Sequence, residues 1–481
     1  MSIGSFLRRQ MTTTRAAALA ALMLALIGMT SALAVRSSAV SKVIEVIRGS
    51  TDTGERFESP RLAALAKQLS AGNAGSNRIV LERFWDEMLG KAPLIEPVDG
   101  DKQSSWVTFL WRGNEETHRV HVLNGPAMGL SGIWLTHLSD TDLWFRTERV
   151  PNNSRFIYWF QVNWPVTPPK SHEDELELMR TKCQLLRDPL NSRGALGPPP
   201  GSLAELPEAP PRPWTDPLPG APKGKVLEHK IKSHILAGQT PGVQQERTLM
   251  VYRPPNYDPG GERCSLLLFF DGQGFGDELM PIPMILDQLI AQKRITPTVA
   301  VFVFQSRDRD KELSCSEPFA DFVAKEVVPW VRKNYHVSPD PRRTIVSGIS
   351  TGGLMAGYCG FRHAGVFGNV LSLSGAYFWY PGVDEGTAPL KAEPGWLTRQ
   401  FVTSPRRPVR FYLAAGRFEI GPPPTLSLLG ENRRLRDVLE AKGYSVRYRE
   451  FSGGHDAFGW RGPLIDGLIA LSVESGRDDG P

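Results

Sequence analysis

Two regions of the chain differ in how their hydrophobic and polar residues are spaced. From Trp106 to Trp164, short segments alternate apolar and polar residues between Gly, Asn and Asp turns. A period of two is typical of strands with one buried face, so this region predicts a β-sandwich-like, immunoglobulin-like module. Two helices are expected before it, within 59–72 and 78–90, because apolar residues recur there at a spacing of three and four.

In the second half of the chain, wholly apolar segments alternate with longer amphipathic ones. Strands that are apolar on both faces and separated by helices indicate a mostly parallel sheet covered on both sides, which is an α/β fold. The expected strands lie within 225–236, 246–255, 265–270, 298–304, 343–348, 369–375, 409–416 and 446–451. The expected helices cover 283–293, 319–335, 353–365 and 431–443.

A segment rich in Pro and Gly separates the two regions. It cannot hold a helix or a central strand and is expected to form an extended linker. The resulting domain organisation is a signal peptide (1–34), a β-rich N-terminal domain (35–190), the linker (191–225), an α/β-hydrolase domain (226–475) and a short tail (476–481).

The first residues have the pattern of an export signal. Arg8, Arg9 and Arg15 come before the apolar run Ala16–Met29, and the small-x-small sequence Ala32-Leu33-Ala34 follows it. The run is shorter than the roughly 20 apolar residues of a spanning helix, so we expect a cleaved signal and a periplasmic or secreted protein without stable membrane insertion. An uncleaved N-terminal anchor is the alternative.

Composition and charge narrow the function classes. Hydrophobic residues make up 41% of the chain, charged residues 22%, and the formal charge is +5. Because no basic run is interleaved with aromatic residues, no nucleic-acid partner is expected, and the charge fits a mixed surface or an anionic small substrate. Four cysteines are too few for a disulfide scaffold; Cys264 and Cys315 are the candidate for one bridge. No Cys/His set has zinc spacing, so no metal or other cofactor is expected.

The first candidate for chemistry is Ser350, at the centre of the sequence Gly348-Ile-Ser-Thr-Gly352. A β-branched strand precedes it and a helical segment follows, which is the order of a nucleophile elbow. The serine must occupy a strained turn, and small residues two before and two after it avoid a clash. The alternative is a serine in a glycine-rich turn, since G-x-S-x-G alone is a weak signal.

The candidate base is a histidine after the serine in the chain, because that is the order of nucleophile, acid and base in α/β-hydrolases. His363 lies in or at the end of the helix that starts at the nucleophile and would point away from it. His455 follows the last expected strand in a glycine-rich loop, at the carboxyl edge of the sheet. We therefore predict His455 as the general base.

The candidate acid is Glu419, just past the strand within 409–416. A carboxylate there can accept the second imidazole N–H and stabilise the imidazolium. Asp437 lies on a helix, and Asp456 is adjacent to the histidine with its side chain expected to point elsewhere. The alternative is that Glu419 forms a salt bridge at the rim and that Ser350 and His455 act as a dyad.

The oxyanion hole requires two backbone N–H groups aimed at the developing negative charge. One is expected from Thr351, the residue after the nucleophile, and the other from Gly272 or Gln273 in the loop after an apolar strand. Asp271 precedes the nucleophile and is expected to shape this loop by accepting hydrogen bonds.

Several longer segments resemble one family, the enterochelin (enterobactin) esterases of the esterase D group. In the second half these are "LLLFFDGQ", "VSGISTGGLMAGYCGFRHAGVFGNVLSLSGAYFW" and "FSGGHDAFGWRGPLIDGLIAL", and in the first half "WVTFLWRG", "SRFIYWFQVN" and "RDPLN". The resemblance implies a serine hydrolase that opens the trilactone of a catecholate siderophore, with Ser350 and His455 as the matching residues. Its arginine corresponds to Arg309, which could meet catecholate oxygens; the alternative is an ion pair with Glu312.

Three functions fit these observations. The first is an exported serine esterase that acts on a siderophore such as ferric enterobactin, although family members with this N-terminal domain are typically cytoplasmic. The second is an enzyme for another ester, either a feruloyl-type esterase or a mycolyltransferase-like acyltransferase in which a sugar hydroxyl replaces water. The third is a non-catalytic protein that binds a ferric siderophore.

Overall fold

A computed structural model describes eleven stretches of the chain: 57–126, 132–165, 178, 184–194, 200–211, 218–237, 246–271, 280–306, 308–382, 394–420 and 427–473. The predicted signal peptide and tail lie outside these residues. Across the stretches described, none of the helices combines the length and the apolar character that crossing a membrane requires.

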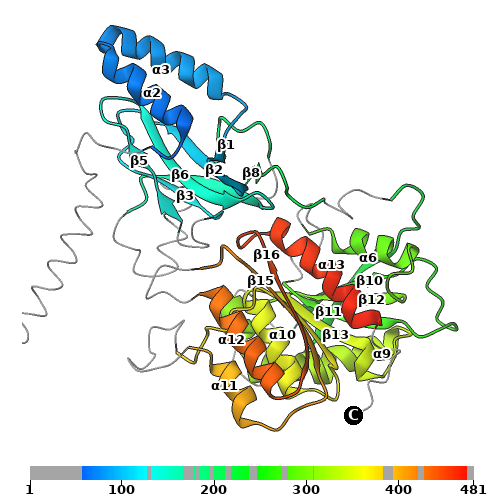
Figure 1. Cartoon of the computed structure of the whole chain (residues 1–481). Helices are drawn as coiled ribbons and strands as arrows, with labels where there is room; N and C mark the ends of the chain where they lie inside the picture. Colours follow the sequence, from blue (N-terminus) through cyan, green and yellow to red (C-terminus); the bar gives the residue numbers. More distant parts are fainter. Residues whose placement is uncertain are drawn as a thin grey trace, which may run out of the picture. The chain divides into compact units, whose positions relative to one another are not determined.

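The N-terminal domain is a helical pair followed by two antiparallel four-stranded sheets, as the alternating pattern predicted (Figure 1). The helices are α2 (Pro60–Ala71) and α3 (Ala74–Met88). One sheet has the order β1 (Leu94–Val98), β2 (Asp101–Arg112), β6 (Leu143–Pro151), β5 (Thr136–His137), and the other β4 (Ile133–Trp134), β3 (Val120–Leu123), β7 (Arg155–Val162), β8 (Ser202–Glu205). Phe109 of the first sheet packs edge-on against Tyr158 of the second, with 5.0 Å between ring centroids, so both sheets share one core.

The segment Asp188–Asn191 ties the end of this domain to its core. The buried Tyr158 hydroxyl donates to Asp188 at 2.5 Å and accepts from Asn191 at 3.1 Å. Asn191 also donates to the carbonyl of Leu203 in β8, which pairs with β7. The predicted linker over 191–225 is therefore too long: residues 202–205 form an edge strand of the N-terminal domain, a place that the proline-rich composition allows.

The second domain is built on one eight-stranded sheet, and its wholly apolar strands are buried as expected. The strand order is β16 (Ser445–Phe451), β15 (Arg410–Gly416), β14 (Asn369–Leu373), β13 (Thr344–Ile349), β11 (Ser265–Phe270), β12 (Thr298–Val303), β10 (Glu246–Arg253), β9 (Lys225–Lys232). The six strands from β16 to β12 are parallel, and β10 is antiparallel to both of its neighbours. Their carboxyl ends therefore meet at one edge of the sheet.

Helices cover both faces of this sheet, which confirms the α/β-hydrolase fold class. Figure 1 shows α6 (Ile282–Ala291) and α13 (Ala457–Val473) on one face, where their apolar residues form one core cluster. The other face carries α10 (Thr351–Arg362), α11 (Trp396–Thr403), α12 (Leu428–Ala441) and a continuous helix made of α8 (Glu317–Phe322), the wide turn η2 (Val323–Val327) and α9 (Val328–Asn334). Shorter elements are α5 (His234–Ala237), α7 (Arg309–Leu313) and the single turn η3 (Pro341–Arg343).

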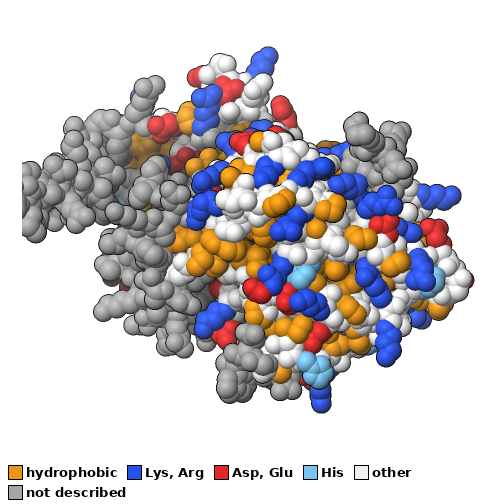
Figure 2. All heavy atoms as spheres, turned by 90° about the horizontal axis from the view of Figure 1, so that it is seen from below, with side chains coloured by type: hydrophobic (Ala, Val, Ile, Leu, Met, Phe, Trp, Pro, Cys, Tyr) orange, Lys and Arg blue, Asp and Glu red, His pale blue; other side chains and the backbone are white. Residues whose placement is uncertain are grey.

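Two further features bear on the sequence predictions. The suggested Cys264–Cys315 disulfide is wrong, because both thiols are free. Cys264 lies just before β11, at the amino ends of the parallel strands. Cys315 follows α7, beyond the carboxyl end of the neighbouring strand β12, so the two cysteines lie toward opposite ends of the strands. Figure 2 shows Lys and Arg side chains spread among acidic and hydrophobic ones on the face drawn, rather than gathered in one band.

Candidate active site

Ser350 occupies a strained corner between β13 and α10. Its φ of 56° and ψ of −121° lie outside the regions that non-glycine residues prefer. Its N–H donates to the carbonyl of Leu373, and its own carbonyl accepts from Ala376, so the end of β14 holds the corner from the side. The corner thus has the strained strand-to-helix geometry that the predicted nucleophile elbow requires.

The two glycines of the elbow are under unequal constraint. A Cβ added to Gly348 would lie 2.4 Å from the carbonyl carbon and oxygen of Gly352, which are backbone atoms that cannot rotate away. A Cβ on Gly352 would meet Asp271 Oδ2 at 3.1 Å and is otherwise in ordinary contact. Gly348 is therefore required by the fold of the turn, and Gly352 much less so.

Glu419 and His455 meet, although they come from different loops. Glu419 follows β15, and His455 lies in the loop Ser452–Asp456 between β16 and α13, called here the histidine loop. His455 Nδ1 lies 2.7 Å from Glu419 Oε1, and the Glu419 side chain is fully buried. Because a carboxylate only accepts, Nδ1 carries the proton of this hydrogen bond and Nε2 is left as an acceptor.

The second oxygen of Glu419 and the ring of His455 are also restrained. Glu419 Oε2 accepts the N–H of Gly416 at 2.8 Å, which fixes the carboxylate against the end of β15. The ring of Trp460 stands edge-on to that of His455 at 4.8 Å, and its Nε1 donates to Ser374 Oγ at 2.8 Å. Ser374 follows β14, next to the residue that holds the elbow, so Trp460 connects the two sides of the site. Trp460 was not predicted as a site residue from the sequence.

The predicted oxyanion donors are partly described. Thr351 is the first residue of α10, where a helix leaves its N–H groups without intrahelical partners. Gly272 and Gln273 lie outside the described residues. The described residue before them is Asp271, whose φ of 60° turns the chain at the end of β11 and whose N–H donates to Gln305 Oε1 at 3.0 Å.

Arg309 is paired, but not with the expected partner. It makes a bidentate ion pair with Asp271, with distances of 2.5 and 2.6 Å, and Asp271 thereby accepts hydrogen bonds as predicted. Glu312 instead pairs with Arg247 at 2.6 Å, so the Arg309–Glu312 alternative is wrong. Although burial opposes it, the hydrogen bonds that Arg309 donates to Asp271 leave the pKa of Arg309 above its usual value. Arg309 thus anchors the start of the predicted oxyanion loop.

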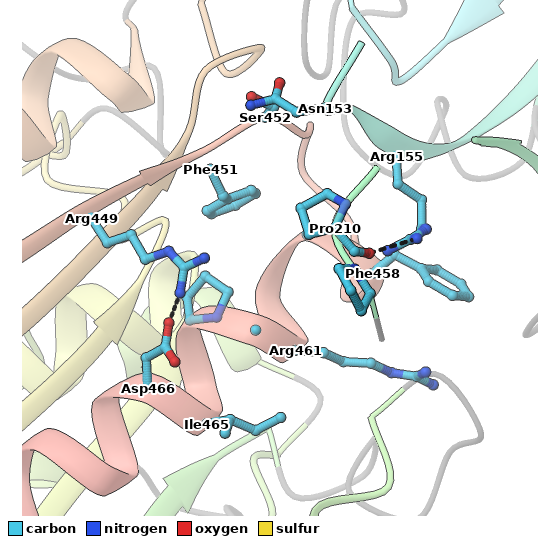
Figure 3. Close-up of a pocket in the computed structure, with 14 residues that line it drawn as sticks. Asn153, Arg155, Pro210, Arg449, Phe451, Ser452, Phe458, Arg461, Ile465 and Asp466 are labelled. Carbon is cyan, nitrogen blue, oxygen red and sulfur yellow. Dashed lines mark hydrogen bonds and ion pairs between the residues drawn. The ribbon is translucent and has the colours of Figure 1, made fainter. Parts of the chain in front are cut away.

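A cavity of about 360 Å³ borders the histidine loop without including the predicted catalytic residues (Figure 3). The histidine loop and α13 contribute Ser452, Phe458 and Arg461, and the N-terminal domain contributes Arg155 and Pro210. Ser350, Glu419 and His455 do not line it, so it is not the predicted ester site. Its walls nevertheless show that the two domains meet beside the histidine loop.

Comparison with known proteins supports the same architecture. Residues 240–471 match the model of a putative esterase family, and residues 106–215 match that of the enterochelin esterase N-terminal domain. The iron(III) enterobactin esterase of Dickeya dadantii is 28% identical over 433 residues, which cover 84% of this chain and 94% of that protein. The corresponding Escherichia coli K12 enzyme is 29% identical over 391 residues, covering 76% and 90%. The crystal structure of the Shigella flexneri enterobactin esterase in the presence of enterobactin matches with a TM-score of 0.60 and 28% identity, over 81% of this chain and 97% of that one.

Proposed function

The chain belongs to the enterochelin esterase family and is a carboxylic ester hydrolase; from this premise we propose that it cleaves the ester bonds of a catecholate siderophore such as ferric enterobactin. The observation that carries the proposal is the Glu419–His455 hydrogen bond of 2.7 Å in a chain whose nucleophile elbow is intact. The names of the relatives support the substrate class, because the similarity extends over both domains.

In the proposed first half-reaction, Ser350 Oγ attacks a lactone carbonyl carbon while His455 Nε2 takes the hydroxyl proton. Glu419 keeps the proton on Nδ1 and stabilises the imidazolium that forms. The N–H groups of Thr351 and Gln273, with Gly272 giving close approach, stabilise the oxyanion. When the carbon–oxygen bond of the lactone breaks, His455 returns the proton to the leaving alkoxide, which leaves an acyl group on Ser350.

In the second half-reaction, water attacks the acyl-enzyme. His455 Nε2 removes a proton from the water and then gives it to Ser350 Oγ, so the serine is regenerated and a carboxylic acid is released. The protein side chains supply every proton transfer in this scheme. Ferric iron, where present, enters as part of the substrate.

Arg309 is proposed to lie at the substrate pocket. It is held at Asp271, the residue before the predicted oxyanion donors. The pairing with Asp271 and Asp310 uses three of the guanidinium's N–H groups, and a guanidinium has five. The remaining donors could meet catecholate oxygens, so Arg309→Lys is expected to raise KM for a siderophore more than for a simple aryl ester.

Export is also proposed, from the N-terminal pattern alone. The basic residues, the apolar run and Ala32-Leu33-Ala34 support a cleaved signal, and hence hydrolysis in the periplasm or outside the cell. Determining the N-terminal residue of the protein recovered from cell fractions would test this. An uncleaved N-terminus on a membrane-bound protein would favour an anchor.

The test of the function is chromatography of ferric enterobactin after incubation with the purified protein and with Ser350→Ala. We expect the trilactone to disappear and the linear trimer and monomer to appear, with the variant slower by roughly 10⁵-fold or more. If enterobactin is untouched but p-nitrophenyl butyrate is cleaved in a Ser350-dependent way, the mechanism holds and the substrate is another ester. Tight siderophore binding without labelling of Ser350 by a fluorophosphonate would instead favour a binding protein.

A further inference from the structure

The histidine loop starts far from the elbow in the sheet. It follows β16, the edge strand, which lies three strands from β13 and the elbow. At about 4.8 Å per strand this is roughly 14 Å, so the loop must lean across β15 and β14 to bring an imidazole to Ser350. Two backbone bonds, from Arg417 to Phe451 and from Phe418 to Gly453, hold it against the loop after β15.

A third hold comes from the N-terminal domain, at the point where β3 ends. Leu123 pairs with Trp159 of β7, and then Asn124, with φ of 59°, turns the chain away. Because the pairing ends there, β3 offers no backbone hydrogen-bond partner to the N–H and C=O groups of Ile157 in β7. Asn124 Nδ2 donates to the Ile157 carbonyl at 2.8 Å, and Asp456 Oδ2 accepts the Ile157 N–H at 3.3 Å.

The same two side chains bond to each other and to the histidine. Asn124 Nδ2 also donates to Asp456 Oδ2 at 3.0 Å, and Asn124 Oδ1 accepts the backbone N–H of His455 at 3.2 Å. A Cβ on Gly454 would lie only 2.4 Å from Asn124 Oδ1, which shows how closely the loop packs.

Asp456 extends this contact into the hydrolase domain. It is 4% exposed, and its Oδ1 caps α13 by accepting the N–H groups of Phe458 and Gly459 at 2.9 and 3.1 Å. Asp456 therefore bonds α13 with one oxygen and the N-terminal domain with the other. The backbone of His455 is thus held by Asn124, and the next residue, Asp456, is held by α13 and by Ile157. None of these hydrogen bonds involves Glu419.

The other half of the acid–base pair is held in the same way. Phe418, the residue before Glu419, belongs to the core cluster of the N-terminal domain and packs edge-on against Phe156, with ring centroids 6.0 Å apart. One side chain of this short turn thus enters the N-terminal domain while the next contacts His455.

We propose that the N-terminal domain completes the catalytic site, with Asn124 as a positioning residue that holds His455 over the elbow through the histidine loop and Asp456. The proposal rests on the proposed roles of Ser350 and His455. It does not depend on the siderophore, because any ester that uses this base requires the same position.

The experiment compares Asn124→Gly with Asn163→Gly in the full-length protein. Glycine accepts the positive φ at both sites, so each variant removes side-chain bonds without adding backbone strain. Asn163 also has φ of 59°, accepts the His118 N–H at 2.8 Å and donates to the Glu116 carbonyl at 2.8 Å, all within its own domain. Since Asn163, like Asn124, is half-buried, it is a matched control for the loss of side-chain hydrogen bonds at a turn with positive φ.

For Asn124→Gly we expect kcat for p-nitrophenyl butyrate to fall about 10- to 100-fold with KM nearly unchanged, because misplacing a catalytic group by about 1 Å costs up to about 100-fold. The rate of fluorophosphonate labelling of Ser350 should fall in parallel. Asn163→Gly should keep both rates within twofold while lowering the melting temperature by a similar amount. If Asn124→Gly keeps its kcat, or if Asn163→Gly loses as much, the proposal is wrong.

A second pair of variants covers the case in which Asn124→Gly folds poorly. Asn124→Asp keeps the size of the side chain but places a carboxylate against Asp456 and against the Ile157 carbonyl, whereas Asn163→Asp places one against the Glu116 carbonyl, away from the histidine loop. We expect Asn124→Asp to lower kcat at least fivefold and Asn163→Asp to keep it within twofold, and equal kcat values of the two variants would overturn the proposal. If Ser350→Ala and His455→Ala retain wild-type rates, the proposed mechanism itself fails, an outcome distinct from the first two.

Discussion

The elbow and the histidine loop carry Ser350 and His455, the two side chains proposed to react, yet they are built in opposite ways. The elbow is local: Gly348, Ser350 and Gly352 span five residues, and the strain at Ser350 is held by the strand before it and the neighbouring β14. The histidine loop is assembled from remote segments, since His455 contacts Glu419, 36 residues earlier, and Asn124, 331 residues earlier. His455 and Glu419 could be predicted from their places after two strands, whereas the contact with Asn124 that holds the loop could not be recognised from sequence.

Among the contacts that hold the histidine loop and the elbow, the largest effect is expected at the one between Glu419 and His455. Glu419→Gln keeps the size of the side chain but lets its amide face Nδ1, which favours the tautomer that protonates Nε2. We expect kcat to fall by roughly 10³- to 10⁴-fold with normal folding. Asp437→Asn is the control, because Asp437 is exposed and pairs with Arg436, and it should keep the wild-type kcat on the same aryl ester. Equal activity of the two variants would mean that Ser350 and His455 act as a dyad.

The second prediction separates the two glycines of the elbow. Gly348→Ala must move the carbonyl of Gly352 by about 1 Å, and with it the serine, so we expect kcat to fall about 100-fold or more. Gly352→Ala touches only a carboxylate oxygen of Asp271 and should lose less than about tenfold. Labelling rates and melting temperatures would be measured for both. If the two variants are equally impaired, the elbow is less local than its geometry indicates.

The parts of the molecule that were predictable are those with local patterns. The strands that are buried on both faces, the elbow and the order of Ser350, Glu419 and His455 all follow from short motifs. Helices α11 and α13 were not anticipated; α13 carries Pro463 and several glycines, which mask its helical period, and its first turn depends on the cap from Asp456. No sequence pattern pointed to Asn124, because its proposed role depends on contacts with His455 and Asp456, which lie more than 300 residues later in the chain.

The third prediction concerns Trp460, the contact that connects the two sides of the site. Trp460→Phe keeps an aromatic ring beside His455 but removes the bond from Nε1 to Ser374. One hydrogen bond is worth about 1 kcal/mol, so we expect kcat to fall about fivefold. A double-mutant cycle with Ser374→Ala should show coupling, since each change removes the same bond. Additive losses would mean that Trp460 acts only by filling space.

The smallest effect on turnover is expected at Asp188, which, like Asp456, is a buried carboxylate that bonds to the N-terminal domain. It lies in the Tyr158–Asn191 network and has no contact with the histidine loop among its bonds to Tyr158, Leu190 and Ser202. Burial raises the pKa of Asp188 to about 6, although the hydrogen bond from Tyr158 opposes this. Asp188→Asn should therefore leave kcat unchanged, unlike Asn124→Gly.

Its effect should instead appear in stability and depend on pH. Because the pKa is raised on folding, the folded state holds the proton more tightly, and the resulting stabilisation is complete below about pH 4 and is lost as the pH rises through 6. The wild-type free energy of unfolding should thus fall relative to that of Asp188→Asn by about 2 kcal/mol between pH 4 and pH 7.5. Urea unfolding of both proteins at several pH values measures this difference. A difference that does not change with pH would show that Asp188 is ionised throughout. A loss of kcat in Asp188→Asn would show that any disturbance of the N-terminal domain reaches His455, and Asn124 would then have no specific positioning role.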